Sequence, residues 1–140
     1  MKIRLMIFGL VMSYALVASA SERIRVTESR DENGKSTYWF ITKERLAKIP
    51  EWDTRSPLPL PVENAVSKAT EWIEARHAKF TEWDFASIGL SKIWDSDLKN
   101  RWFYNISMSG TIDVDGIKAC SCFFVVILMD GTIVKSTEKE

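Results

Sequence analysis

The sequence is short of the residues on which most catalytic chemistry depends. It holds one histidine, His77, and two cysteines, Cys120 and Cys122. It has no Gly-x-Ser-x-Gly elbow, no glycine-rich phosphate loop and no paired-cysteine zinc pattern. We therefore assign no catalytic residue, no metal site and no cofactor, and we expect a protein that is not an enzyme.

An excess of charge of one sign is missing as well. The 140-residue chain has 19 Lys and Arg residues against 19 Asp and Glu residues. A nucleic acid or an anionic membrane as partner would call for a basic excess. The balance of charge therefore argues against nucleic acid as a partner.

One long apolar run stands at the N-terminus. Lys2 and Arg4 introduce an apolar stretch over residues 5–17, and Ala18-Ser19-Ala20 follows it. This order predicts a cleavable secretory signal peptide over residues 1–20. The alternative is a membrane anchor, but the run is shorter than the ~20 residues that a spanning helix needs. We expect an exported protein, periplasmic or extracellular, with one domain at 21–140 and no membrane span after cleavage.

The two cysteines stand two positions apart, so on a strand they share one face. A disulfide between them would be strained, and two thiols are too few ligands for zinc. Two reduced thiols, a strained redox-active bridge and a metal site remain as alternatives. Cys120 and Cys122 are thus the redox candidates. A thiol-dependent redox protein or enzyme that uses them, with His77 as its only histidine, is the alternative function.

The first half of the domain divides into a hairpin and a connector. Strand-like segments at 24–27 and 37–42 flank an Asn-Gly turn, which predicts a β-hairpin within residues 21–49. All four prolines fall within residues 50–61. Because proline lacks a backbone donor and restrains its predecessor, this stretch is an extended connector, or alternatively a proline-motif ligand.

The second half predicts a helix followed by a sheet. Apolar residues recur at spacings of three and four over 62–80, which is typical of an amphipathic helix. Alternating apolar and polar residues over 85–137 predict antiparallel strands. A two-residue turn at Asp115-Gly116 would set an apolar row opposite another apolar row. In that register Tyr104, Ile106 and Met108 face Ile127, Val125 and Phe123. A shift of one residue would set them against Val126, Phe124 and Cys122, which are also apolar, so a slip in register is the alternative.

The predicted fold is α+β, with one long amphipathic helix packed on a curled antiparallel β-meander after an N-terminal hairpin. Over about residues 60–137 this order resembles, in outline, the cystatin-like and PepSY-like architectures. The inhibitory Gln-x-Val-x-Gly loop of cystatins is absent, and the nearest hairpin region reads Ser87-Ile88-Gly89-Leu90-Ser91. The resemblance therefore implies an architecture and no function.

Aromatic residues suggest where a partner would bind. The chain has six tryptophans, and large aromatic side chains serve either as core or as exposed anchors. Four aromatic residues fall outside the main core pattern and form the candidate binding surface: Tyr38, Trp39, Trp52 and Trp83. We expect a non-catalytic binding domain whose partner is an unknown protein, peptide or envelope component.

Overall fold

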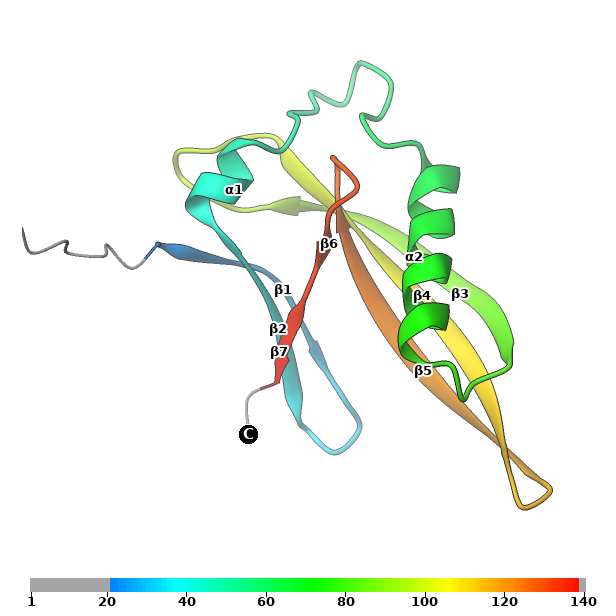
Figure 1. The fold of residues 1–140 in the computed structure, drawn as a ribbon. Helices are drawn as coiled ribbons and strands as arrows, with labels where there is room; N and C mark the ends of the chain where they lie inside the picture. The colour runs from blue at the N-terminus through cyan, green and yellow to red at the C-terminus, as the bar shows by residue number, and fades with distance from the viewer. Residues whose placement is uncertain (1–20, 139–140) are drawn as a thin grey trace, which may run out of the picture.

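The computed structural model describes residues 21–138, which form two antiparallel sheets and two short helices (Figure 1). One sheet has the strand order β1-β2-β7 and the other β3-β4-β5-β6. The predicted signal peptide at 1–20 lies outside the described residues and stays a prediction. In chain order the elements are β1 (Arg23–Arg30), β2 (Ser36–Thr42), α1 (Lys43–Ala47), α2 (Val62–Arg76), β3 (Glu82–Ile93), β4 (Arg101–Val114), β5 (Ile117–Leu128), β6 (Ile133–Val134) and β7 (Ser136–Glu138).

The predicted fold class is wrong. The protein is mainly β, with 49% of its residues in strands and 17% in helices, and it has no long amphipathic helix packed on a meander. Helix α2 ends at Arg76 instead of continuing to Phe80, because His77 leaves the helical conformation (φ −125°, ψ 48°). The ring of Phe80 packs against Trp83 and Phe123 instead. A tertiary aromatic contact thus ends the helical periodicity.

The second sheet forms because the C-terminal segment changes partners. β6 pairs with β5 at Val126 and Ile127. After Lys135 the chain continues as β7, which pairs with β2 instead of β5. In Figure 1 this C-terminal segment runs from one sheet to the other. The two sheets are therefore joined along β6 and β7 and diverge from Lys135 onwards.

The N-terminal hairpin contains the two segments that the sequence predicts as strands, and β1 and β2 pair antiparallel. Asp31 shapes the turn between them, because its carboxylate accepts hydrogen bonds from the backbone N–H groups of Asn33 and Lys35. Gly34 adopts a φ of +81° there, which glycine does without strain. The short helix α1, which follows β2 directly, was not expected.

The β4–β5 hairpin has the predicted register. Its turn residues Asp115 and Gly116 have φ angles of 53° and 82°, as a type I′ turn requires. The apolar row of β4 faces the apolar row of β5. The observed pairs include Tyr104 with Ile127, Ile106 with Val125 and Met108 with Phe123.

The core lies at one end of the four-stranded sheet. Helix α2 buries Ala65, Ala69 and Ile73 completely, and Thr70 Oγ1 lies 3.9 Å from the sulfur of Met108 on β4. Even-numbered residues of β4 from Tyr104 to Met108 are accordingly buried. Helix α2 therefore covers the face of the sheet to which these residues point.

The opposite face of the same end carries α1, whereas the connector lies on the α2 face, to which Tyr104 points. Arg101, buried on β4, donates from Nε to the carbonyl oxygen of Leu46 in α1 at 3.2 Å. The hydroxyl of Tyr104 donates to the carbonyl oxygen of Leu60 at 2.8 Å, so the Pro-rich connector is fixed to the sheet just before α2. One continuous cluster of buried apolar residues spans both sheets and both helices.

Candidate functional site

Strand β5 has a buried half and an exposed half. Residues 125–128 are buried, whereas residues 117–122 are exposed. Figure 1 shows why: the β4–β5 hairpin extends past α2, and its tip projects from the body. Val114, Ile117 and Phe124 expose large apolar side chains on this hairpin, with 72% of Ile117 and 43% of Phe124 accessible. Val114 and Ile117 share one face of the hairpin and Phe124 lies on the other, so each face carries exposed apolar surface.

One edge of the exposed half has no strand beside it. β5 pairs with β4 along its whole length, but with β6 only at Val126 and Ile127. Among residues 21–138, no strand pairs with this edge between Ile117 and Val125. Lys118 carries its only charge, and neither a proline nor a bulge interrupts it. The edge thus lacks most features that keep natural edge strands from pairing.

The hydrogen-bonding groups on this free edge belong to even-numbered residues. Leu128 shows which residues these are. Its N–H donates to Thr132 O and its C=O accepts from Gly131 N–H, so both groups point to the side of β5 that faces away from β4. Groups that point outward alternate along an antiparallel strand. The backbone N–H and C=O groups that point to the free edge are therefore those of Lys118, Cys120, Cys122 and Phe124.

A cleft of about 300 Å³ lies between this part of β5 and the β1–β2 hairpin. Trp39, only 6% exposed, lines it from β2. Arg30 and Asp31 line it from the hairpin turn, and Cys122 and Phe124 line it from β5. The cleft therefore combines aromatic surface with charges of both signs and borders the free strand edge. We call it the fork cleft.

An aromatic cluster on the α2 side fixes β5 at the border between its two halves. The ring of Phe123 lies 4.4 Å from that of His77, 5.1 Å from that of Phe80 and 5.3 Å from that of Trp83, measured between centroids. Trp83 lies over Gly110, where an added Cβ would come within 2.7 Å of the indole. The cluster holds β5 in place just where the free edge begins.

The four predicted binding residues do not share one location. Trp39 lines the fork cleft, and Trp83 contacts Phe123, which also lines it. Tyr38 points to the other face of β2 and stacks on Phe40. Trp52 packs edge-on against Trp102. Trp102 on β4 pairs with Lys92 on β3. Lys92 is nine residues from Trp83, or about 30 Å along the strand, so Trp52 lies far from the fork cleft.

Sequence reasoning missed Phe124, the exposed aromatic residue of the fork cleft. Phe124 belongs to the predicted strand 122–129, which is apolar on both faces, so the pattern does not single it out as a binding residue. An apolar run over two faces is equally compatible with a strand that awaits a partner. The missing information was which part of the run α2 and β6 cover.

The two cysteines are free and exposed. Their side chains point away from α2, because Phe123, of opposite parity on β5, points towards it. His77 contacts Phe123, so the strand separates this histidine from both thiols. The geometry therefore offers no Cys–His pair. The redox hypothesis for Cys120 and Cys122 stays a prediction, and Cys122 belongs to the fork cleft.

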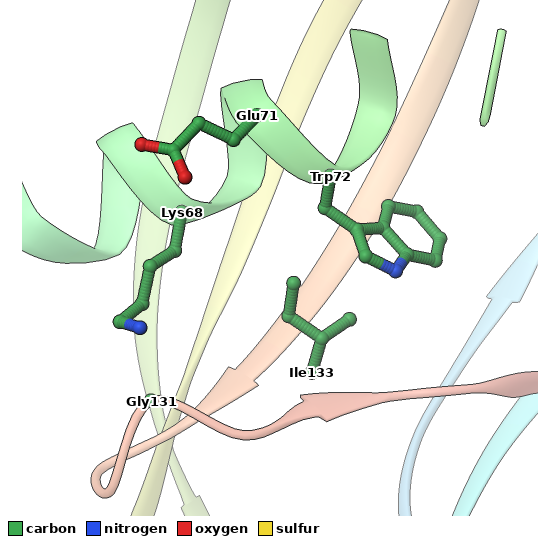
Figure 2. Close-up of a pocket in the computed structure, with 5 residues that line it drawn as sticks. All are labelled: Lys68, Glu71, Trp72, Gly131 and Ile133. Atoms are coloured by element: carbon green, nitrogen blue, oxygen red, sulfur yellow. The ribbon is translucent and has the colours of Figure 1, made fainter. Parts of the chain in front are cut away.

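Two further hollows lie between α2 and the C-terminal strands. One, of about 290 Å³, is lined by Lys68, Glu71 and Trp72 on α2 and by Gly131 and Ile133. Figure 2 shows Trp72 lying towards Ile133 and Lys68 reaching towards Gly131. A neighbouring hollow of about 280 Å³ continues past Trp72. The apolar side chains there, Trp72 and Ile133, are half-buried, so these hollows expose less apolar surface than the fork cleft.

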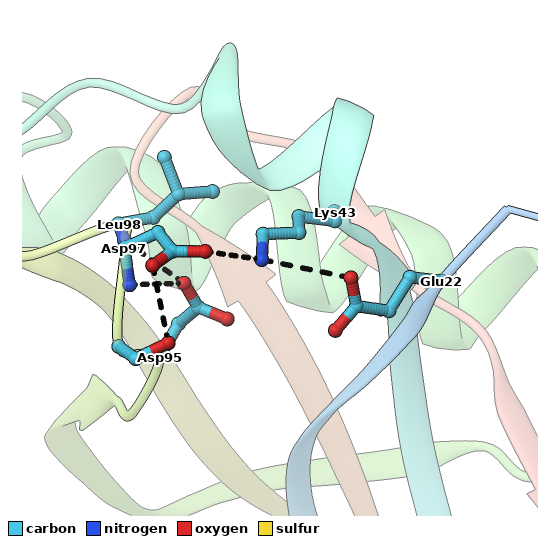
Figure 3. A network of polar contacts seen from close by, with 6 residues as sticks. Glu22, Lys43, Asp95, Asp97 and Leu98 are labelled. Atoms are coloured by element: carbon cyan, nitrogen blue, oxygen red, sulfur yellow. Dashed lines mark hydrogen bonds and ion pairs between the residues drawn. The ribbon is translucent and has the colours of Figure 1, made fainter.

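A polar network ties α1 to the loop between β3 and β4. Lys43 Nζ lies 2.6 Å from Asp97 Oδ2 and 3.5 Å from Glu22 Oε2 (Figure 3). The hydrogen bond between Lys43 and Asp97 raises the pKa of Lys43 and lowers the pKa of Asp97. Asp95 accepts from the backbone N–H groups of Asp97 and Leu98. The network organises this loop, and we assign it no further role.

Other sources of functional information are negative. Within residues 21–138, no group of three His, Cys, Asp or Glu side chains lies close enough to hold a metal ion. No helix in the same range is long and apolar enough to cross a membrane. Comparison with known proteins finds no matching family model, curated protein or solved structure.

Proposed function

We propose that this protein is a non-catalytic binding domain that takes up an extended polypeptide segment as an added strand on the free edge of β5. The observation that carries the proposal is the unpaired edge from Ile117 to Val125 beside the fork cleft. In strand addition, main-chain hydrogen bonds supply affinity for an extended segment of almost any sequence. Pockets for alternate side chains supply specificity.

The fork cleft supports this mode of binding. A segment that pairs with Cys120 to Phe124 runs along the cleft, so its side chains meet Trp39 and Phe124. Arg30 and Asp31 at the turn of the β1–β2 hairpin offer one charge of each sign to the neighbouring positions. We therefore expect an extended segment with an apolar residue flanked by polar or charged residues. The apolar run before Ser21 supports an exported setting for this encounter.

The test uses a displayed library of random peptides, selected on residues 21–140. Selected peptides are then titrated into isotope-labelled protein while amide hydrogen exchange is followed by NMR. We expect the outward-pointing amides of Cys120, Cys122 and Phe124 to become protected, because each gains a main-chain acceptor. Peptides that bind while these amides still exchange freely would contradict strand addition, and so would a library that yields no binder.

A matched pair of variants distinguishes specific binding in the fork cleft from nonspecific apolar adsorption. Phe124→Ala removes an aromatic wall of the cleft, and we expect it to weaken the selected peptides about tenfold or more. Val114→Ala removes a comparably exposed apolar side chain from the same hairpin, away from the cleft. Peptide affinity should survive this second change. Equal losses from both variants would indicate nonspecific apolar adsorption.

A further inference from the structure

We infer that the strand added to the β5 edge is the same edge of a second copy of this chain, in a symmetric antiparallel dimer. The inference rests on the proposed function, since it requires that the edge accept a strand. It goes further by naming the occupant. Three observations carry it: the self-complementarity of the edge, the contents of the fork cleft, and the positions of the two cysteines.

The free edge pairs with itself over its full length when a two-fold axis passes through Ser121. In that register Ile117 faces Val125 of the second copy, and Ala119 faces Phe123. Lys118 faces Phe124, so like charges do not oppose each other. A shift of the axis to Lys118 would place two lysines opposite each other and would shorten the paired segment. Full overlap is therefore the favoured register.

The same register fills the fork cleft. It brings Lys118 of the second copy beside Phe124, which shares the cleft with Arg30 and Asp31. Lys118 of the second copy thereby approaches Asp31, and a contact with it requires that Lys118 give up its ion pair with Glu82 of its own chain, at 3.0 Å. The pairing ends at Ile117 of the second copy, before the positions at Val126 and Ile127 that β6 occupies. Each copy places its Lys118 at the cleft of the other, as an isologous interface requires.

The cysteines fit this arrangement in a way that can be measured. Cys120 lies opposite Cys122 of the second copy as a hydrogen-bonded pair, with Cα atoms about 5.5 Å apart. That separation is within the range that a disulfide bridges. Cys120 and Cys120 of the second copy lie diagonally across the two strands, with Cα atoms about 7–8 Å apart, which is outside the range that a disulfide bridges. The dimer therefore permits only unlike cysteines to react.

The first test uses Cys120→Ser and Cys122→Ser chains with glutathione disulfide as oxidant. Two thiols lose two electrons and two protons to form the protein disulfide, and glutathione disulfide takes them up as two glutathione thiols. We expect each variant alone to give little disulfide-linked dimer on a non-reducing gel, and the mixture of both to give at least fivefold more. Equal cross-linking of single variants and mixture would overturn the register.

The second test removes the thiols from the readout. Under reducing conditions, sedimentation of the full mature chain should show a concentration-dependent dimer. Ser121→Lys places like charges across the axis and should raise the dimer dissociation constant about fivefold or more. Ser121→Glu should do the same, and an equimolar mixture of the two variants should restore the dimer. A wild-type chain that stays monomeric at every concentration would overturn the inference.

The two proposals fail in different ways. If the chain is monomeric but selected peptides protect the amides of Cys120, Cys122 and Phe124, the second copy is the wrong occupant and strand addition stands. If neither a dimer nor a protecting peptide is found, the edge accepts no strand and both proposals fall. The Ser121→Lys variant keeps its free edge, so it should still bind the selected peptides.

Discussion

Ile117 and Ile127 lie on the same strand and point to the same face, yet Ile127 is fully buried and 72% of Ile117 is exposed. The difference comes from their neighbours. Around Ile127, α2 packs on the sheet and β6 pairs with the edge. Around Ile117, α2 has ended and no strand within residues 21–138 covers the edge of β5. One strand therefore serves both as core and as exposed surface.

This comparison separates the part of the molecule that maintains the fold from the part that is free to bind. The buried half of β5 belongs to the single apolar cluster that holds the two sheets together. The exposed half keeps its strand conformation through β4 alone. We expect changes in the first half to alter stability and changes in the second half to alter binding.

The largest effect is expected from paired isoleucine truncations. Ile127→Ala leaves a cavity in the core and should lower the free energy of unfolding by about 2–5 kcal/mol. Ile117→Ala removes the same atoms from an exposed site and should stay within about 0.5 kcal/mol. Urea unfolding at low protein concentration under reducing conditions measures both. Similar losses would show that the hairpin tip is part of the core.

The border between the buried and the exposed half of β5 is tested by a substitution at Gly110. Gly110→Ala would place a Cβ within 2.7 Å of the Trp83 ring and should cost about 1–3 kcal/mol through overpacking. Gly89→Ala on β3 is the matched control, because its nearest atom lies at 3.9 Å. Urea unfolding, followed by circular dichroism, compares the two. A neutral Gly110→Ala would mean that the indole moves away freely.

The attachment of the connector to the core is tested at Tyr104. Tyr104→Phe leaves the carbonyl oxygen of Leu60 without its donor and should lower the free energy of unfolding by about 1–2 kcal/mol. Burial, followed by the negative charge of Glu63, raises the pKa of Tyr104 above its ordinary value of 10.0. The folded state therefore retains the phenolic proton more strongly than the unfolded state does.

The pH dependence of this variant follows from the sign of the shift. The contribution of the protonated Tyr104 hydroxyl to the free energy of unfolding is complete below pH 10. It is lost as the pH rises above 10 towards the pKa of Tyr104 in the folded state. The wild type should lose more stability on this alkaline limb than Tyr104→Phe does. Unfolding midpoints measured across that limb decide the matter, with Tyr38→Phe as the half-buried control. Parallel curves for wild type and Tyr104→Phe would contradict the assignment.

The smallest effect is expected in the exposed network around α1. The hydrogen bond from Lys43 lowers the pKa of Asp97 below its ordinary value of 3.8. The contribution of this carboxylate is therefore present above that value and lost as the pH falls through the folded pKa. Asp97→Asn should slightly flatten the acid limb of stability, while Asp115→Asn at the hairpin tip should not. Salt should weaken the difference, because Asp97 is exposed and Lys43 is only half-buried.

Local patterns predicted much of the secondary structure and one detail of the pairing. A two-residue turn at Asp115-Gly116 predicted the observed register of β4 and β5, because such a turn permits one alignment, whereas the apolar rows alone also allow a slip by one residue. The start of α2 at Val62 followed from Pro61 and the helical spacing. These features depend on neighbours in the chain, which a sequence displays directly.

The candidate site was only partly predictable. Trp39 was identified as a binding candidate and lines the fork cleft, but Trp52 lies far from it. Phe124 and Ile117 went unrecognised, since their exposure depends on where α2 stops and where β6 leaves β5. Both boundaries are set by contacts between distant segments. The aromatic contact of Phe80 with Phe123 is one, and the pairing of β7 with β2 is the other.

By itself, the sequence determined the turns, including the Asp115-Gly116 turn that favours the observed register of the β4–β5 hairpin, and the scarcity of catalytic side chains. Each of these is a matter of backbone geometry over a few residues or of composition. The tertiary structure alone decided the division into two sheets and the free edge of β5. Those outcomes depend on which of several equally apolar segments the C-terminal strand pairs with. Local preference does not distinguish between such partners, whereas packing in three dimensions does.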